Sequence, residues 1–401
     1  MQTSHRKIFG ALVISALVVA GFVFTATRLN FCATAAGGEP QLAHPGWRLA
    51  PPVSYENLTI FPVVTSPDLD TSRFATLDEA LASGEALISE QGSEIRRTRE
   101  GAVVPNDSPG PSVNQLVLIN RGKRPLILLA GEVVSGGKQD RVIGKDRIVP
   151  IGAAPLPLDV FCVEHGRWTP GAVQFSAAQT MVHPSVRDKA AVEQDQKQVW
   201  AAVRGEASDV GTSTQTVTVE SGVATAAPSP QVSRSAIAGA IDASGTQSYQ
   251  KIYEYSPIGT SVEAFTQEMQ RRFARQTSDL KGEHVVGVVV AFGQEVAWSD
   301  IFASSRLFDA YWPKLLRSYV VEAMTRPRIR RTASIDDARE FLRPAKGHIE
   351  EESEPGVYRW RKQAEGRLAE IELEALDPKP FTLHWLRVLH GDSYVRPGYV
   401  E

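Results

Sequence analysis

Short apolar runs separated by polar turns recur through the first half of the chain and predict β-strands. Runs of four to eight apolar residues bounded by Gly, Pro or Asn are typical of buried strands. The predicted strands lie at residues 55–64, 113–119, 125–130, 142–143, 148–151 and 158–163. The second and third of these runs flank the loop Asn120-Arg121-Gly122-Lys123, which predicts a β-hairpin. We expect the later runs to continue an antiparallel arrangement.

Helical spacing appears between and after these runs. Thr76 and Glu79 have the spacing of a capping box, and the helix that they open is predicted to extend to about Glu90. Residues 184–204 also have apolar positions at helical spacing. A second capping box, Thr260 with Glu263, predicts the start of another helix. The buried face of that helix is expected to contain Val262, Phe265, Met269 and Phe273.

The last third of the chain mixes strands and helices. Residues 285–292 are nearly all apolar and predict a central strand, and residues 307–324 predict a helix with a kink or fresh start at Pro313. A capped helix at 334–342 precedes a hairpin with a Glu365-Gly366 turn and a final strand at 381–390. Strands at both ends with helices between them indicate an α+β fold with a mostly antiparallel, β-rich core.

The N-terminus carries an apolar run without a charge at residues 8–26, preceded by Arg6 and Lys7. Its length suits a helix that spans a bilayer, and the preceding positive charge predicts that the rest of the chain lies outside the cytoplasm. A small-residue pattern at 33–35 leaves cleavage by a signal peptidase open, which would give a periplasmic or secreted protein. We favour the uncleaved, single-pass anchor in the cell membrane.

Composition divides the remaining chain. We expect an anchor or signal peptide at 1–31, a spacer at 32–53, and an α+β domain in two parts, 54–204 and 249–401. Between the two parts, residues 205–248 are dominated by small and polar side chains and predict a low-complexity insertion. With 401 residues the chain is long enough for a sizeable core, and its net charge of -3 argues against a nucleic-acid partner.

The candidate chemistry is concentrated in residues 131–168, where polar side chains stand at the ends of predicted strands. Glu132 and Glu164 are the candidate catalytic residues, as general base and acid facing each other across a cleft. An anionic ligand would be bound by Lys138, Gln139, Arg141, Arg167 and Trp168. The alternative is a purely structural network in which the two glutamates pair with Arg141 and Arg167, and in which Trp168 is a core aromatic.

Other kinds of site receive little support. The glycine-rich turn at 131–137 lacks the spacing of a phosphate-binding loop, although its amides could face an anion. The histidines are scattered without metal-ligand spacing, so neither a metal nor another cofactor is predicted. Cys162 is expected to be a small buried hydrophobic residue.

Four sequence segments carry a resemblance to a known family. GEVVSGGKQDR at 131–141 and VFCVEHGRW at 160–168 resemble the domain family named for its association with ADP-ribosylglycohydrolase and rhodanese-phosphatase proteins. FPV at 61–63 and DIFASSRLFDAYWPKLLRSYVVEA at 300–323 fit the same pattern, and the resemblance covers residues 55–390. It implies a link to ADP-ribose or NAD metabolism through the family's neighbours, without a known reaction.

Three functions follow as hypotheses. The first is an anchored or exported domain that binds a small anionic ligand, such as an ADP-ribose-like molecule. The second is a hydrolase acting on such a ligand, with a glutamate as general base. The third is a non-catalytic scaffold or interaction module in which the ionic residues only hold strands together.

Overall fold

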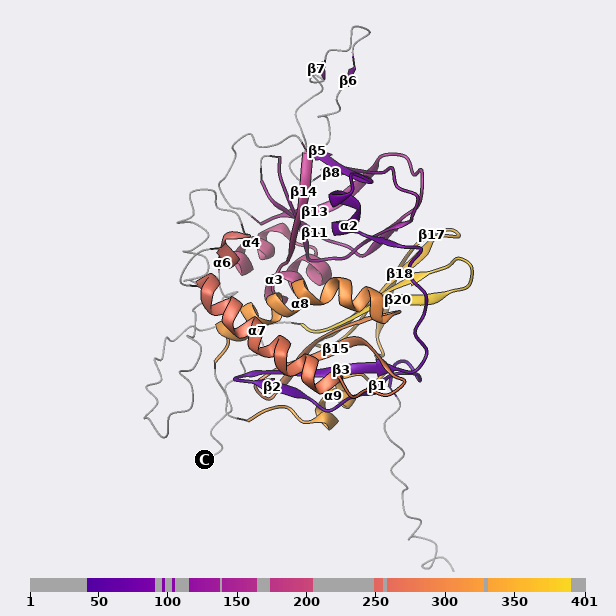
Figure 1. Cartoon of the computed structure of the whole chain (residues 1–401). Coiled ribbons are helices and arrows are strands. Elements are labelled where there is room, and N and C mark those ends of the chain that lie inside the picture. The colour runs from indigo at the N-terminus through magenta and orange to yellow at the C-terminus, as the bar shows by residue number, and fades with distance from the viewer. Residues whose placement is uncertain are drawn as a thin grey trace, which may run out of the picture. The chain divides into compact units, whose positions relative to one another are not determined.

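A computed structural model describes residues 42–90, 96–97, 103–104, 115–137, 139–163, 174–204, 249–254, 258–327 and 331–390 (Figure 1). All of them belong to one compact unit, Leu42–Glu401. The apolar run at 8–26 and the low-complexity insertion at 205–248 lie outside the described residues. Within the described ranges, no helix is long and apolar enough to cross a membrane. The structure confirms the α+β class and the antiparallel, β-rich core.

The largest element is a nine-stranded sheet in which every strand pair is antiparallel. Its strand order is β1-β3-β15-β16-β20-β19-β18-β17, with β2 paired to β3. The strands are β1 (Arg48–Leu49), β2 (Val53–Tyr55), β3 (Leu58–Thr65), β15 (His284–Phe292), β16 (Glu295–Phe302), β17 (His348–Glu354), β18 (Tyr358–Glu365), β19 (Leu368–Ala375) and β20 (Phe381–Leu389). Because β15 lies between β3 and β16, the predicted central strand is confirmed.

A closed six-stranded barrel forms the second β-structure, in the order β10-β11-β13-β8-β5-β14. Its strands are β5 (Ala86–Glu90), β8 (Gln115–Asn120), β10 (Glu132–Ser135), β11 (Arg141–Ile143), β13 (Leu156–Cys162) and β14 (Gln174–Met181). A small sheet beside it contains β4 (Ala75–Thr76), β9 (Leu126–Leu128) and β12 (Arg147–Val149), and β6 (Arg96–Arg97) pairs with β7 (Val103–Val104).

The predicted hairpin around residue 121 is wrong, because its two arms belong to different sheets. Strand β8 pairs with β5 and β13 in the barrel, whereas β9 pairs with β12 and β4. The Asn120 side chain donates hydrogen bonds to the carbonyl oxygens of Arg124 and Val149, at 3.0 and 3.1 Å. These bonds tie the loop to β12, so the chain leaves the barrel instead of folding back on β8.

The predicted helix at 77–90 is only half correct. Helix α2 (Leu77–Ala82) begins with the predicted capping box of Thr76 and Glu79, but it ends at Ala82. Gly84 adopts a left-handed conformation with φ 73°, which commonly ends a helix. Beyond it the buried positions Ala86 and Ile88 alternate with more exposed ones, which is the period of a strand.

Two further boundaries differ from the sequence prediction. Residues 184–204 form α3 (Pro184–Asp188), a π-helical turn η1 (Lys189–Glu193) and α4 (Gln196–Arg204), with a break at left-handed Gln194. The pairing of Glu365 with Leu368 shifts the last hairpin turn by one residue, to Gly366-Arg367. In both cases a positive φ, at Gln194 or Gly366, sets the boundary.

The predicted second capping box is wrong, because α7 (Ile258–Thr277) already begins before Thr260. Its expected buried face of Val262, Phe265, Met269 and Phe273 is confirmed. Two short helices, α6 (Lys251–Glu254) and α9 (Ile335–Phe341), flank this part of the fold in sequence, and α9 has the predicted Ser334 cap.

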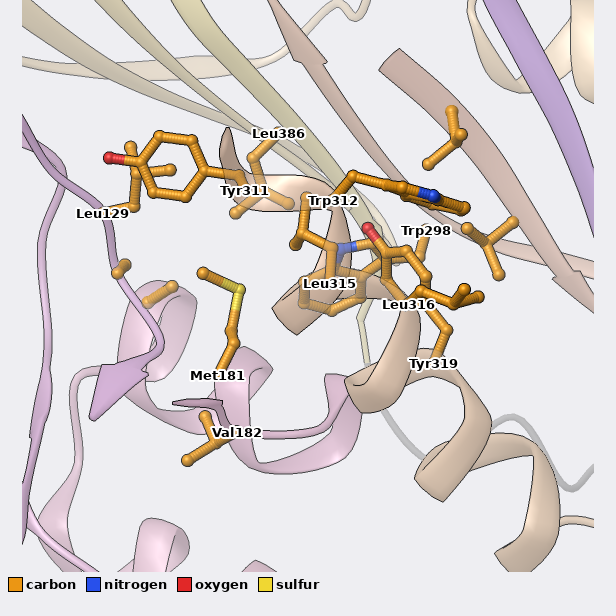
Figure 2. Close-up of a cluster of buried hydrophobic side chains, with 14 of the residues drawn as sticks. Leu129, Met181, Val182, Trp298, Tyr311, Trp312, Leu315, Leu316, Tyr319 and Leu386 are labelled. Carbon is orange, nitrogen blue, oxygen red and sulfur yellow. The ribbon is translucent and has the colours of Figure 1, made fainter. Parts of the chain in front are cut away.

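Helix α8 (Ser305–Thr325) is the element that connects the two β-structures. It continues through Pro313 as one helix, so the predicted fresh start does not occur. It contacts β15 and β16 of the large sheet on one side and β14 of the barrel on the other, and α7 packs along it (Figure 1). Figure 2 shows its Tyr311, Leu315 and Tyr319 in the shared core with Trp298 and Met181. Polar side chains on this helix are therefore placed between the barrel and the sheet.

Candidate functional site

The turn at residues 129–132, between β9 and β10, is held in place by side chains from other parts of the chain. The Ala130 amide donates to Asp146 Oδ1 at 2.7 Å, and the Ala130 carbonyl accepts from Arg187 Nε at 2.7 Å. Gly131 has φ +99°, and a Cβ there would lie 2.7 Å from Arg187 Cδ. Only glycine fits this position, because any side chain would be strained and would displace the arginine.

A buried ionic cluster is centred on Asp300 of β16. Arg187 Nη1 lies 2.7 and 2.9 Å from its two carboxylate oxygens. Trp298 Nε1 donates to Oδ2 at 2.7 Å, and the Tyr319 hydroxyl donates to the same oxygen. His384 Nε2 lies 3.1 Å from Oδ1. Asp300 is fully buried, so each partner replaces a hydrogen bond that water would otherwise supply.

His384 joins this cluster to the turn. Its Nδ1 lies 2.6 Å from Asp146 Oδ2, so the imidazole stands between two carboxylates. Burial alone would lower the pKa of His384, but Asp146 and Asp300 outweigh it and raise that pKa. Burial alone would raise the pKa of Asp300, but Arg187 and the hydrogen bonds from His384 and Tyr319 hold it well below its usual range. Two carboxylates, one imidazolium and one guanidinium thus balance in charge.

Stability is therefore expected to decrease as the pH rises through the raised pKa of His384. The charged imidazolium contributes fully below its unfolded pKa of about 6.5, and this contribution disappears once the folded state also loses the proton. Chemical denaturation at a series of pH values from about 6 to about 9 measures how the free energy of unfolding changes with pH. This range begins near the ordinary pKa of histidine and extends above it.

The pKa of His390 is also raised, first by its hydrogen bond with Asp188, so the measurement belongs in a His390→Gln background. The slope should survive in that background and disappear when His384→Gln is added. An unchanged slope in the double variant would show that His384 is not the titrating group.

A second ionic cluster lies on the other side of the turn, around Lys314 of α8. Lys314 Nζ lies 2.6 Å from Glu132 Oε1 and 2.8 Å from Asp78 Oδ2, and 4.6 Å from the centre of the Tyr311 ring. Glu132 Oε2 accepts from the Leu129 amide at 2.7 Å. The Lys314 ammonium thus draws together β10, α2 and α8.

The protonation states in this second cluster follow from burial and charge. Burial would lower the pKa of Lys314, but Glu132 and Asp78 outweigh it and raise that pKa. Burial raises the pKa of Glu132, and Lys314 offsets only part of this effect. The lysine is therefore a cation and not a free amine, which removes it as a candidate nucleophile.

Asp78 and Lys314 also lie at the wall of a groove between α7 and α8 with a volume of about 670 Å³. Gln179 of β14 also lines the groove, from outside α7 and α8. Its charged lining residues are Asp78, Glu263, Arg271, Lys314 and Arg317. Two further carboxylates pair with this lining from outside it, Glu132 with Lys314 and Glu268 with Arg271.

The structure separates the site residues that the sequence predicted. Glu132 is 1% exposed and belongs to the Lys314 cluster, so the alternative in which it pairs with Arg141 is wrong for the described residues. Gln139 and Arg141 are buried in the barrel, where Arg141 Nη1 donates to the Gln139 carbonyl at 2.8 Å. The groove lining contains neither of them.

The remaining predicted residues, Lys138, Glu164, Arg167 and Trp168, lie outside the described residues. The catalytic roles of Glu132 and Glu164 and the ligand-binding roles of the other five residues stay predictions.

The sequence interpretation missed Asp300, Arg187, Lys314 and Asp78. A signal was present for two of them. Asp300 interrupts an apolar strand, and Lys314 falls among apolar residues of a helix in which it is only 4% exposed. A charge inside an apolar pattern indicates a buried, paired group. Arg187 and Asp78 stand in polar surroundings and had no such signal.

The fold and the two ionic clusters define an α+β domain that is organised around a buried polar core. The model of the family described as "ARG and Rhodanese-Phosphatase-superfamily-associated Protein domain" matches residues 46–385. The chain therefore belongs to this family, which confirms the resemblance seen in the sequence. No curated protein and no solved structure matches the chain.

Proposed function

We propose that this domain binds a small anionic ligand in the groove between α7 and α8. The observation that carries the proposal is the charged lining, with Arg271, Arg317 and Lys314 against two carboxylates. The volume of about 670 Å³ falls within the range of small-molecule sites, about 300–1,000 Å³. A ligand with negative charge would be met by the exposed guanidinium groups of Arg271 and Arg317.

The two arginines are the groups that contact the anion. Their side chains are 64% and 45% exposed for Arg271 and Arg317, and each forms one ion pair, with Glu268 and Glu263 respectively. A guanidinium has five N–H donors in a planar fork, so a single carboxylate leaves donors for a phosphate or carboxylate of the ligand. The buried Lys314 ammonium also lines the groove, where Glu132 and Asp78 already balance its charge.

We assign Glu132 a positioning role in this site. Both of its carboxylate oxygens accept a hydrogen bond, Oε1 from Lys314 and Oε2 from the Leu129 amide. Glu132 therefore fixes the position of the Lys314 ammonium from a buried site. A general base must reach the proton that it removes, and Glu132 does not reach the groove surface. Binding without hydrolysis is the function that this geometry supports best.

The ligand class that we propose is a nucleoside-diphosphate sugar of the ADP-ribose kind. Its pyrophosphate supplies the negative charge for the two arginines, and the family is named for its association with ADP-ribosylglycohydrolase proteins. The proposed setting is a domain carried by an N-terminal anchor at residues 8–26. ADP-ribose is the probe. At a concentration of about one hundred times the Kd, it is expected to stabilise the domain by about 2.7 kcal/mol and to raise the melting temperature by several degrees.

The matched variants are Arg271→Gln with Arg317→Gln as the test, and Arg275→Gln as the control on the same helix. Arg275 is exposed and is not part of the groove lining, so its variant should keep the full melting shift. The double variant should lose most of it. Chromatography of the recovered ADP-ribose is expected to show no turnover. A melting shift that is absent in the wild type, or equal in all variants, would contradict the proposed site.

A further inference from the structure

We infer that the α7 wall of the groove recognises an uncharged planar group that carries a hydrogen-bond donor next to an acceptor, as an adenine edge or a carboxamide does. This inference rests on the proposed function and adds a second recognition element to the anion site. It comes from two glutamines of α7, Gln267 and Gln270, whose amide orientations are fixed by their neighbours.

Gln270 presents a donor. Trp312 Nε1 donates to Gln270 Oε1 at 2.7 Å, and both residues line the groove. An indole N–H can only donate, so the amide oxygen of Gln270 must face the tryptophan. The amide nitrogen, with its two N–H groups, then points away from Trp312. Because Gln270 is exposed, these donors are accessible from the groove.

Gln267 presents an acceptor. Its Nε2 donates to Glu263 Oε1 at 2.9 Å. The other oxygen of Glu263 accepts from Arg317 Nη2 at 3.2 Å. A carboxylate can only accept, so the amide nitrogen of Gln267 must face Glu263. The amide oxygen of Gln267 is therefore left as an acceptor, opposite in character to the donors of Gln270.

The two amides lie side by side, because residues three apart on a helix share a face. The pair offers an acceptor and a donor to one ligand edge, which is the pattern that an amide side chain uses to read adenine. The amino group of adenine would donate to Gln267 and a ring nitrogen would accept from Gln270. A carboxamide presents the same two groups in the same order.

A third glutamine of the groove lining comes from β14. Gln179 is exposed and has φ +50°, a left-handed conformation that a residue other than glycine rarely adopts. It lies in the register shift between β10 and β14, where Glu132 pairs with Met181 and Val134 with Ala177, so the bulge accounts for this conformation. Gln179 thus adds a polar group to the groove lining from an element other than α7 and α8.

The test compares nucleotides that carry the same phosphates but different edges. ADP is expected to bind about tenfold or more tightly than inosine diphosphate, whose keto oxygen would meet the Gln267 oxygen. Nicotinamide mononucleotide against nicotinic acid mononucleotide tests the carboxamide source. A preference for the amide is the result that the hydrogen-bond pattern of Gln267 and Gln270 predicts.

The variant Gln270→Glu keeps the bond from Trp312 and replaces the donor by an acceptor. This variant should abolish the binding preference within each nucleotide pair that shows one in the wild type. The control is Gln174→Glu, the same change on an exposed residue of β14 outside the groove, which should keep that preference. Equal binding within both pairs in the wild type would overturn the inference and leave the anion site standing. Failure of all four nucleotides and of ADP-ribose to bind would overturn the proposed function itself.

Discussion

Substitution of Arg187 by methionine is expected to lower the free energy of unfolding by about 3–5 kcal/mol. The guanidinium is 1% exposed and is the main counter-charge of fully buried Asp300, so its loss leaves a carboxylate with less compensation in a dry environment. The same change removes the hydrogen bond to the Ala130 carbonyl and opens space beside Gly131. Urea denaturation at neutral pH measures the effect.

The control is Arg343→Met, because Arg343 is half-exposed and pairs with Glu340 on the surface. Exposed ion pairs contribute about 1 kcal/mol or less, so this variant should be nearly neutral. Adding Asp300→Asn to Arg187→Met should restore part of the loss, since the uncompensated charge is then gone. Strictly additive losses in the double variant would mean that the two groups are not coupled.

The second large effect is expected for Lys314→Met, which should also destabilise the domain by about 3–5 kcal/mol. Lys314 is 4% exposed and is the partner of both Glu132 and Asp78. Without the ammonium, the pKa of Glu132 rises further above its unfolded value of about 4.3, because burial and the nearby Asp78 carboxylate are then opposed only by the hydrogen bond from the Leu129 amide. The deficit relative to the wild type should therefore grow as the pH rises, since the carboxylate must ionise without its partner.

Exposed Lys281 provides the matched control, and Lys281→Met should change stability by less than about 0.5 kcal/mol at every pH. Combining Lys314→Met with Glu132→Gln should flatten the pH dependence. A deficit of Lys314→Met that is small, or that is independent of pH, would show that Glu132 does not depend on Lys314 for its charge.

Local patterns in the sequence were sufficient for most individual elements. The capping box at Thr76, the capped helix that starts at Ser334, the central strand β15 and the buried face of α7 depend on neighbouring residues only, and all were predicted correctly. Errors occurred where a single backbone conformation or a distant contact decided the outcome. Gly84 ended a helix early, and the hydrogen bonds of Asn120 to β12 replaced a hairpin.

The candidate site depended on the tertiary structure much more strongly. The sequence marked Glu132 as unusual, and the structure supplied its partners, the Leu129 amide 3 residues away and Lys314, which is 182 residues away on α8. Likewise, Asp300 was present in an apolar run, but Arg187 and His384 reach it from separate parts of the chain.

The sequence by itself determined the family, the α+β class and the periodicities from which the strands and helices form. Only the tertiary structure decided which charges are paired, which are buried and where the groove lies. The physical reason is that hydrophobic periodicity depends on residues close together in sequence, whereas a buried charge requires a partner that is close in space. That partner is set by how β16, β20, α3 and α8 pack together, and not by the residues next to the charge in sequence.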